Sequence, residues 1–117
     1  MKIIIPPIKS QGIKTKLVPS IMSAVPSFSG RWIEPFLGTG VVAFNSEAQK
    51  ALLSDINPHI ISFYQKLHAR EITPQHIREY LYCEGEKLKE AAGDGSIYYK
   101  TVRNRFNTTY NVLDFLF

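Results

Sequence analysis

A glycine turn followed by an acidic residue is the part of this sequence best suited to chemistry. The turn comprises residues 36–40, with Gly38 and Gly40 in it, and the acid is Asp55. Glycines let the backbone turn sharply and keep side chains out of the way of a ligand. In α/β folds that hold a nucleoside, a carboxylate after the next strand accepts hydrogen bonds from the ribose hydroxyls. The pattern therefore predicts a nucleoside site formed by the turn and Asp55.

Two short strands and a helix must position this site. Residues 31–36 are rich in strand-forming side chains, and Glu34 precedes a proline, which favours an extended backbone. Residues 41–48 read as a helix whose first backbone N–H groups would face a ligand above the turn. Residues 51–54 read as a second strand, which places Asp55 at its carboxyl end.

The rest of the chain reads as helices. An asparagine or threonine before a proline is typical of a helix start, with a cap followed by proline at the first helical position. No further strand pattern follows residue 73, so the chain is expected to be α/β, with a mostly helical second half. The helix starts are expected near Thr15 and at the caps Asn57, Thr73, Ser96 and Asn111.

The chain has 117 residues and a net charge of +4, which fits one domain or less and is compatible with nucleic acid without requiring it. Cys83 is the only cysteine, so a disulfide framework and a thiolate metal cluster are excluded. The three histidines lack the spacing of metal ligands. The apolar run at residues 3–5 is too short for a signal peptide or a membrane span, and we expect a cytoplasmic protein that does not contact the membrane.

These residues resemble the Dam-type, adenine-specific DNA methyltransferases, which use S-adenosylmethionine. Residues 9–14 look like the N-terminal cofactor motif of that family, so the similarity runs over nearly the whole chain. The resemblance is carried most strongly by residues 34–40 and 55–57, and further by Phe63-Tyr64, Tyr98-Tyr99, Arg103, Phe106-Asn107 and residues 115–117.

The resemblance implies a partial Rossmann-like methyltransferase domain. Residues 1–57 would form its S-adenosylmethionine-binding part, and residues 58–117 a helical segment that begins the DNA-recognition region. Asp55 would accept from the ribose hydroxyls, Ile56 would pack against the adenine ring, and Lys14 would meet the cofactor's carboxylate. The implied cofactor-binding residues are Ser10, Lys14, Glu34, Phe36, Gly38, Gly40, Asp55 and Ile56.

Three basic residues in the second half, Lys100, Arg103 and Arg105, are candidates for contacts with the phosphates of double-stranded DNA. The alternative is that they form a solvated helix face with the neighbouring tyrosines turned to the core. Both interpretations stay open at the level of the sequence.

The family's catalytic motif, Asp-Pro-Pro-Tyr or a close variant, does not occur in these 117 residues. Two strands are also few for a stable parallel sheet, and the chain closes on a mostly apolar segment with Val112, Leu113, Phe115, Leu116 and Phe117. We therefore expect a truncated methyltransferase, inactive alone, whose last residues belong against a missing part. A small complete α+β protein is the alternative fold.

Two other functions remain open. The chain is compatible with a non-enzymatic module that binds S-adenosylmethionine or pairs with a separate chain carrying the missing half. A nicotinamide-dinucleotide oxidoreductase is less favoured, because Gly-x-Gly-x-x-Gly lacks its third glycine after Gly40.

Overall fold

The computed structural model describes residues 2–8, 12–91 and 93–117. The chain divides into two compact units, Met1–Ile60 and Ile61–Phe117, and each is described by itself. It is a mixed α/β structure with one two-stranded sheet among the described residues. None of the helices in the described segments is long and apolar enough to cross a membrane.

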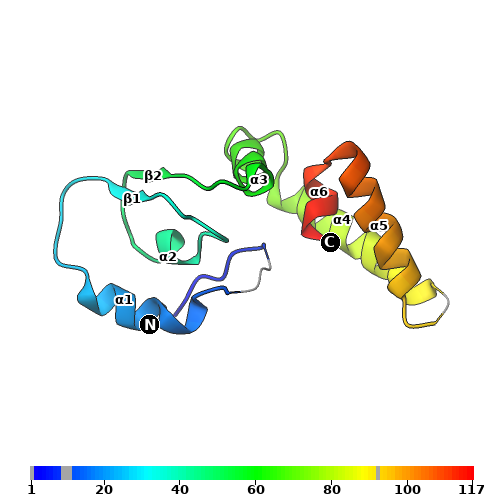
Figure 1. Ribbon diagram of the computed structural model, residues 1–117, viewed down its shortest axis with the longest axis horizontal. Coiled ribbons are helices and arrows are strands. Elements are labelled where there is room, and N and C mark those ends of the chain that lie inside the picture. Colours follow the sequence, from blue (N-terminus) through cyan, green and yellow to red (C-terminus); the bar gives the residue numbers. More distant parts are fainter. Residues whose placement is uncertain (1, 9–11, 92) are drawn as a thin grey trace. The chain divides into compact units, whose positions relative to one another are not determined.

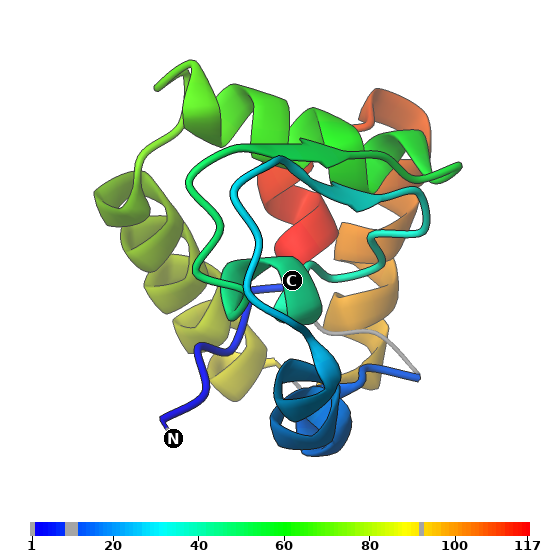
Figure 2. The ribbon, with the colours of Figure 1, turned by 90° about the vertical axis from the view of Figure 1, so that its left-hand side faces the viewer.

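The sheet of the first unit joins β1 (Trp32–Glu34) to β2 (Ala51–Leu53) in parallel. Ile33 lies opposite Leu52 in the register. Backbone hydrogen bonds extend the pairing beyond the strands, with the Leu37 N–H donating to the carbonyl of Ser54 over 2.9 Å. Figure 2 shows the two strands side by side, with the single turn of α2 (Val41–Phe44) beneath them. The hydrogen bonding between the two strands therefore continues up to Leu37, the residue before Gly38 of the turn.

Helix α2 ends at Phe44, so the prediction of a helix over residues 41–48 was too long. The buried side chain of Asn45 is the physical reason. Its Nδ2 donates to the carbonyls of Val41 (2.6 Å) and Ile4 (2.8 Å), and its Oδ1 accepts from the Ile4 N–H (2.8 Å). These bonds tie the N-terminal segment to the end of α2, and Glu47 then takes a positive φ of 58°.

The N-terminal helical segment consists of a 3-10 turn, η1 (Thr15–Leu17), and α1 (Val18–Ala24). The expected start near Thr15 is confirmed, and the chain becomes extended at Val25, just before Pro26. Val18 is fully buried. The buried apolar residues of the first unit are Ile8, Val18, Leu37, Val41 and Ile60.

Helix α3 (Pro58–His68) begins in the first unit and continues into the second, where α4 (Pro74–Glu90), α5 (Ser96–Thr109) and α6 (Val112–Leu116) follow. Three predicted caps are confirmed. Asn57 Oδ1 accepts from the His59 N–H at 2.9 Å and Thr73 Oγ1 from the His76 N–H at 3.2 Å. Asn111 Oδ1 accepts from the first backbone N–H groups of α6.

The prediction that Ser96 caps α5 was wrong. Gly95 is the cap and has a φ of 80°, which a glycine adopts readily. A Cβ at Gly95 would also lie 2.7 Å from Cδ1 of Leu88. Ser96 is the first helical residue, and its N–H donates to Oδ1 of Asp94.

In the second unit, α4, α5 and α6 lie side by side (Figure 1). Val102 and Val112 are buried between them, and Phe63 is completely buried. The aromatic residues at the end of the chain are half-buried rather than fully open, because the Phe115 ring lies 5.5 Å from that of Phe106. Helix α5 therefore covers part of the apolar segment, α6 and Phe117, that the sequence left without a partner.

Candidate functional site

Asp55 closes the glycine turn with its side chain. The Gly38 N–H donates to Asp55 Oδ2 at 2.8 Å, and the Asn57 N–H donates to Oδ1 at 2.9 Å. These two backbone bonds, Asn57 first and Gly38 second, lower the pKa of the Asp55 carboxyl below its usual value. Asp55 is therefore an ionised group that ties the turn after β1 to the end of β2.

The arrangement leaves Asp55 able to bind a ligand. A carboxylate has about four acceptor positions on its two oxygens, and the bonds from Gly38 and Asn57 use one on each. Hydroxyl groups of a ligand can therefore still donate to it. The structure brings Asp55 and Gly38 together as the sequence indicated. The direct bond from the Gly38 N–H to the Asp55 carboxylate was not predicted from the sequence.

Both predicted glycines of the turn have positive φ, 59° at Gly38 and 94° at Gly40. A Cβ at Gly40 would lie 2.9 Å from Cε2 of Phe44, whereas a Cβ at Gly38 would meet nothing within 4 Å. Gly40 is also the cap of α2, which has only four residues. So short a helix presents no strong N-terminal field, and the contribution that we expected from its first N–H groups stays a prediction.

Two large apolar side chains next to the turn are open to solvent. Phe36 follows β1 and is 86% exposed, and Ile56 follows β2 and is 98% exposed. The carboxyl ends of parallel strands meet at one edge of a sheet, which is where α/β folds bind ligands. Exposed apolar side chains beside a carboxylate suit a ligand with both a flat apolar ring and hydroxyl groups.

The other predicted cofactor residues have less distinctive surroundings. Glu34 is the last residue of β1, and its Oε2 accepts from the Trp32 Nε1–H at 3.0 Å. Lys14 is exposed and is the residue before η1. Ser10 lies outside the described residues. The roles of these three residues stay predictions.

A hollow of about 700 Å³ in the first unit lies away from this turn. It is lined by residues after α1 and after α2, from Met22 to Gly30 and from Asn45 to Gln49. None of the predicted cofactor residues lines it, and Glu47 is its only ionisable group. The turn, and not this hollow, has the chemistry of a nucleoside site, so we place the candidate site at the turn.

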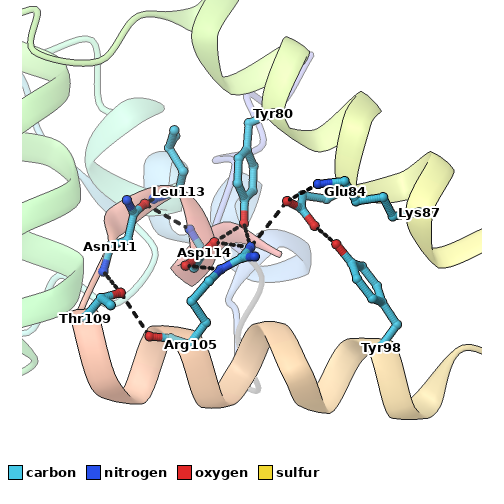
Figure 3. A network of polar contacts seen from close by, with 9 residues as sticks. All are labelled: Tyr80, Glu84, Lys87, Tyr98, Arg105, Thr109, Asn111, Leu113 and Asp114. Carbon is cyan, nitrogen blue, oxygen red and sulfur yellow. Dashed lines mark hydrogen bonds and ion pairs between the residues drawn. The ribbon is translucent and has the colours of Figure 1, made fainter.

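A polar network in the second unit was not foreseen from the sequence (Figure 3). The Arg105 guanidinium donates from Nε to Asp114 Oδ2 at 2.9 Å and from Nη2 to Oδ1 at 2.7 Å. Nη2 also lies 3.3 Å from Glu84 Oε1 and from the Tyr80 hydroxyl. The Tyr80 hydroxyl donates to Asp114, and the Tyr98 hydroxyl donates to Glu84.

This network joins three helices through buried carboxylates. Glu84 on α4 is 5% exposed and Asp114 on α6 is 8% exposed, and Arg105 on α5 pairs with both. Lys87 Nζ also lies 3.6 Å from Glu84 Oε1. The Arg105 guanidinium lowers the pKa of the Asp114 carboxyl, and the bond to Asp114 raises the pKa of Arg105. Tyr80 and Glu84 are four residues apart on α4, which places them on one helix face. That pair of polar side chains was the available sequence signal.

The predicted DNA-contacting residues have different surroundings. Lys100 and Arg103 are exposed on α5, whereas the Arg105 guanidinium pairs with Asp114 and Glu84. Arg103 also borders a hollow of about 290 Å³ between α5 and α6, with aromatic walls. Among the residues that the structure describes, no three histidine, cysteine or acidic side chains are grouped so as to hold a metal ion.

The sequence of this chain is similar to one family of known proteins. Residues 10–116 match the model of the D12 class N6 adenine-specific DNA methyltransferases. A DNA adenine methylase from Vibrio cholerae is 31% identical over 100 residues, which cover 86% of this chain and 33% of that protein. A DNA adenine methylase from Haemophilus influenzae is 39% identical over 59 residues, half of this chain and 21% of the relative.

The retron Ec67 DNA adenine methylase of Escherichia coli is 28% identical over 109 residues, 93% of this chain and 35% of the relative. The chain thus spans about a third or less of the length of these curated relatives. No solved structure matches it. Because the family model covers almost every residue, the chain belongs to the D12 class N6 adenine-specific DNA methyltransferase family.

Proposed function

We propose that residues 1–57 form the S-adenosylmethionine-binding part of an adenine-specific DNA methyltransferase with a Rossmann-like domain. The observation that carries this proposal is the bond from the Gly38 N–H to the Asp55 carboxylate at the carboxyl ends of two parallel strands. Membership of a methyltransferase family requires a methyl donor. A carboxylate and an exposed apolar side chain next to each other suit the ribose and adenine of that donor.

Each residue of the site has a proposed task. Asp55 accepts from the ribose hydroxyls with the acceptor positions that the backbone bonds leave. Ile56 packs on the adenine ring, and Phe36 covers the cofactor beside the turn. Lys14 pairs with the cofactor's carboxylate. When bound, S-adenosylmethionine supplies an electrophilic methyl group on a sulfonium, and these residues hold and orient it.

We propose that double-stranded DNA is the partner of the helical segment, residues 58–117. Lys100 and Arg103 are exposed cations on one helix and suit phosphate contacts. Arg105 is a weaker candidate, because two buried carboxylates already neutralise it. Phosphate contacts position a protein on DNA without reading its sequence.

The residues that would activate the adenine are not among these 117, since the sequence contains no Asp-Pro-Pro or Asn-Pro-Pro. We propose that they come from further polypeptide, either continuous with this chain or separate from it. The chain alone should then transfer no methyl group from labelled S-adenosylmethionine to DNA. Turnover that is lost in an Asp55→Asn variant would contradict this part of the proposal.

Calorimetry with S-adenosylmethionine tests the cofactor site. Asp55→Asn removes the charge that accepts from ribose and should weaken binding by about fivefold to 150-fold, or roughly 1–3 kcal/mol. Asp94→Asn is a matched control, because Asp94 also accepts a backbone N–H and its pKa is also lowered, but it lies in the second unit. Equal affinities of the parent and the Asp55 variant would remove Asp55 from the site. Weaker binding in both variants would point to a general effect of charge.

A further inference from the structure

The Arg105 network has no part in the proposed cofactor site, yet it is the most extensive set of polar contacts in the second unit. It links α4 through Tyr80 and Glu84, α5 through Arg105, and α6 through Asp114 (Figure 3). The two carboxylates are almost fully buried, with side-chain exposures of 6% and 5%. Buried carboxylates keep their charge only when a cation and hydrogen bonds compensate for the lost water.

The geometry commits the guanidinium to these partners. Nε and Nη2 face both oxygens of Asp114, the two-point contact that best matches the planar fork of arginine. Nη2 also donates to Glu84 and Tyr80. A phosphate that took Nε or Nη2 would have to displace a buried carboxylate, and Asp114 would then lose its arginine partner.

Lys100 and Arg103 lie on α5 within two turns of Arg105. The contacts of Arg105 therefore help to set the rotation of α5 about its axis and its position against α4 and α6. A change in that rotation would move both exposed cations relative to α4 and α6.

We propose that Arg105 is a positioning residue that orients Lys100 and Arg103 for DNA through its pairing with Asp114 and Glu84, and that it does not itself contact phosphate. This inference rests on the proposed DNA-binding function. In this proposal Arg105 holds α5 in place against α4 and α6, and its neighbours on the same helix contact the DNA.

A double-mutant cycle on the 117-residue chain tests the inference. The parent, Asp114→Asn, Arg105→Gln and the double variant are compared by fluorescence anisotropy on a labelled DNA duplex and by thermal unfolding. We expect Asp114→Asn to weaken DNA binding about fivefold, because the pairing that orients α5 is lost. The double variant should then bind within about twofold of Asp114→Asn.

A direct phosphate contact predicts the opposite pattern. Asp114→Asn would then bind DNA as well as the parent or more tightly, since it releases the guanidinium, and the double variant would bind several-fold more weakly than Asp114→Asn. That result, or equal binding by all four proteins, overturns the inference. The decisive comparison is between Asp114→Asn and the double variant, so it holds even if Arg105→Gln alone fails to fold.

Arg103→Gln separates the failure of this inference from the failure of the proposed function. If Arg103 contacts a phosphate, the Arg103→Gln variant should show a slope of log affinity against log salt that is smaller in magnitude by about one unit. Its melting temperature should not change. If the folded parent does not bind DNA, the proposed function fails, and melting temperatures decide whether the network exists. Non-additive melting shifts for Arg105 and Asp114 support the pairing, and additive shifts overturn it.

Discussion

Asp55 in the first unit and Asp114 in the second are both held as carboxylates, but by different kinds of partner. Two backbone N–H groups lower the pKa of Asp55, whereas a guanidinium and a phenol lower that of Asp114. Asp55 is half-buried and keeps acceptor positions for a ligand. Asp114 is buried and bound on both oxygens by side chains of two other helices.

The difference separates a carboxylate that can still accept from a ligand from one that is bound within the protein. Backbone donors hold an oxygen in place without neutralising its charge, so Asp55 can still attract a donor from a ligand. A paired guanidinium neutralises the charge and occupies the space around it, so Asp114 stabilises the packing of its helices instead. Charge alone does not tell the two aspartates apart, but the chemical type of their partners does.

The largest effect should come from removing the cation of the second unit. Arg105→Met removes the arginine partner of two buried carboxylates, and breaking a fully buried pair costs about 3–5 kcal/mol. Among the described residues, Asp114 keeps only the Tyr80 hydroxyl, whereas Glu84 keeps Lys87. Because the arginine side chain is 41% exposed, we expect a loss of about 2–3 kcal/mol in the free energy of unfolding, measured in urea. Arg78→Met on the exposed face of α4 is the control and should change it by less than about 0.5 kcal/mol. Equal losses in both variants would show that the contacts of Arg105 contribute no more to stability than those of an exposed arginine.

The backbone bonds of Asp55 should be visible in amide exchange. Asp55→Ala removes the acceptor for the Gly38 N–H, and hydrogen bonds to charged groups are worth about 1.5–3 kcal/mol. We expect exchange at Gly38 to become roughly tenfold to a hundredfold faster. The Trp32 N–H donates to the Lys50 carbonyl at the other end of the strand pair and should be unaffected. Unchanged exchange at Gly38 would contradict the contact.

The two glycines should differ in their tolerance of a side chain. Gly40→Ala places a Cβ 2.9 Å from the Phe44 ring at a φ of 94°, and should cost about 2 kcal/mol of stability. Gly38→Ala meets no atom within 4 Å at a φ of 59°, and should cost about 1 kcal/mol. Thermal unfolding of both variants measures the difference. A larger loss for Gly38→Ala would mean that the turn is packed differently from this description.

The smallest expected effect is on the stability of the protein at acid pH. Both aspartates have lowered pKa values in the folded protein, so each contributes stability that is complete above the ordinary value of about 3.9 and is lost as the pH falls through the folded value. In Arg105→Met the pKa of Asp114 should rise, because its main stabilising partner is gone, while that of Asp55 should not change. Carboxyl chemical shifts followed by NMR would report both groups. A matching rise at Asp55 would argue against independent environments.

Local patterns in the sequence predicted the features that depend on neighbouring residues. The caps Thr73 and Asn111 were confirmed, because a side-chain oxygen placed just before a helix reaches N–H groups two or three residues ahead. The two glycines of the turn have the positive φ that their residue type allows. The position of the parallel strands was also predicted, although each is shorter than expected.

Contacts between distant residues were decided only by the tertiary structure. Asn45 ends α2 because its amide binds Ile4, far away in the sequence, and no helical pattern contains that information. The sequence left open whether Arg105 contacts phosphate or lies on a solvated helix face, because it does not show whether an arginine on a helix faces solvent or a buried acid. Packing of α4, α5 and α6 brings Glu84 and Asp114 to it. The sequence determined which groups are charged, and the fold decided which charges face a ligand and which face each other, because burial makes an unpaired charge too costly to leave.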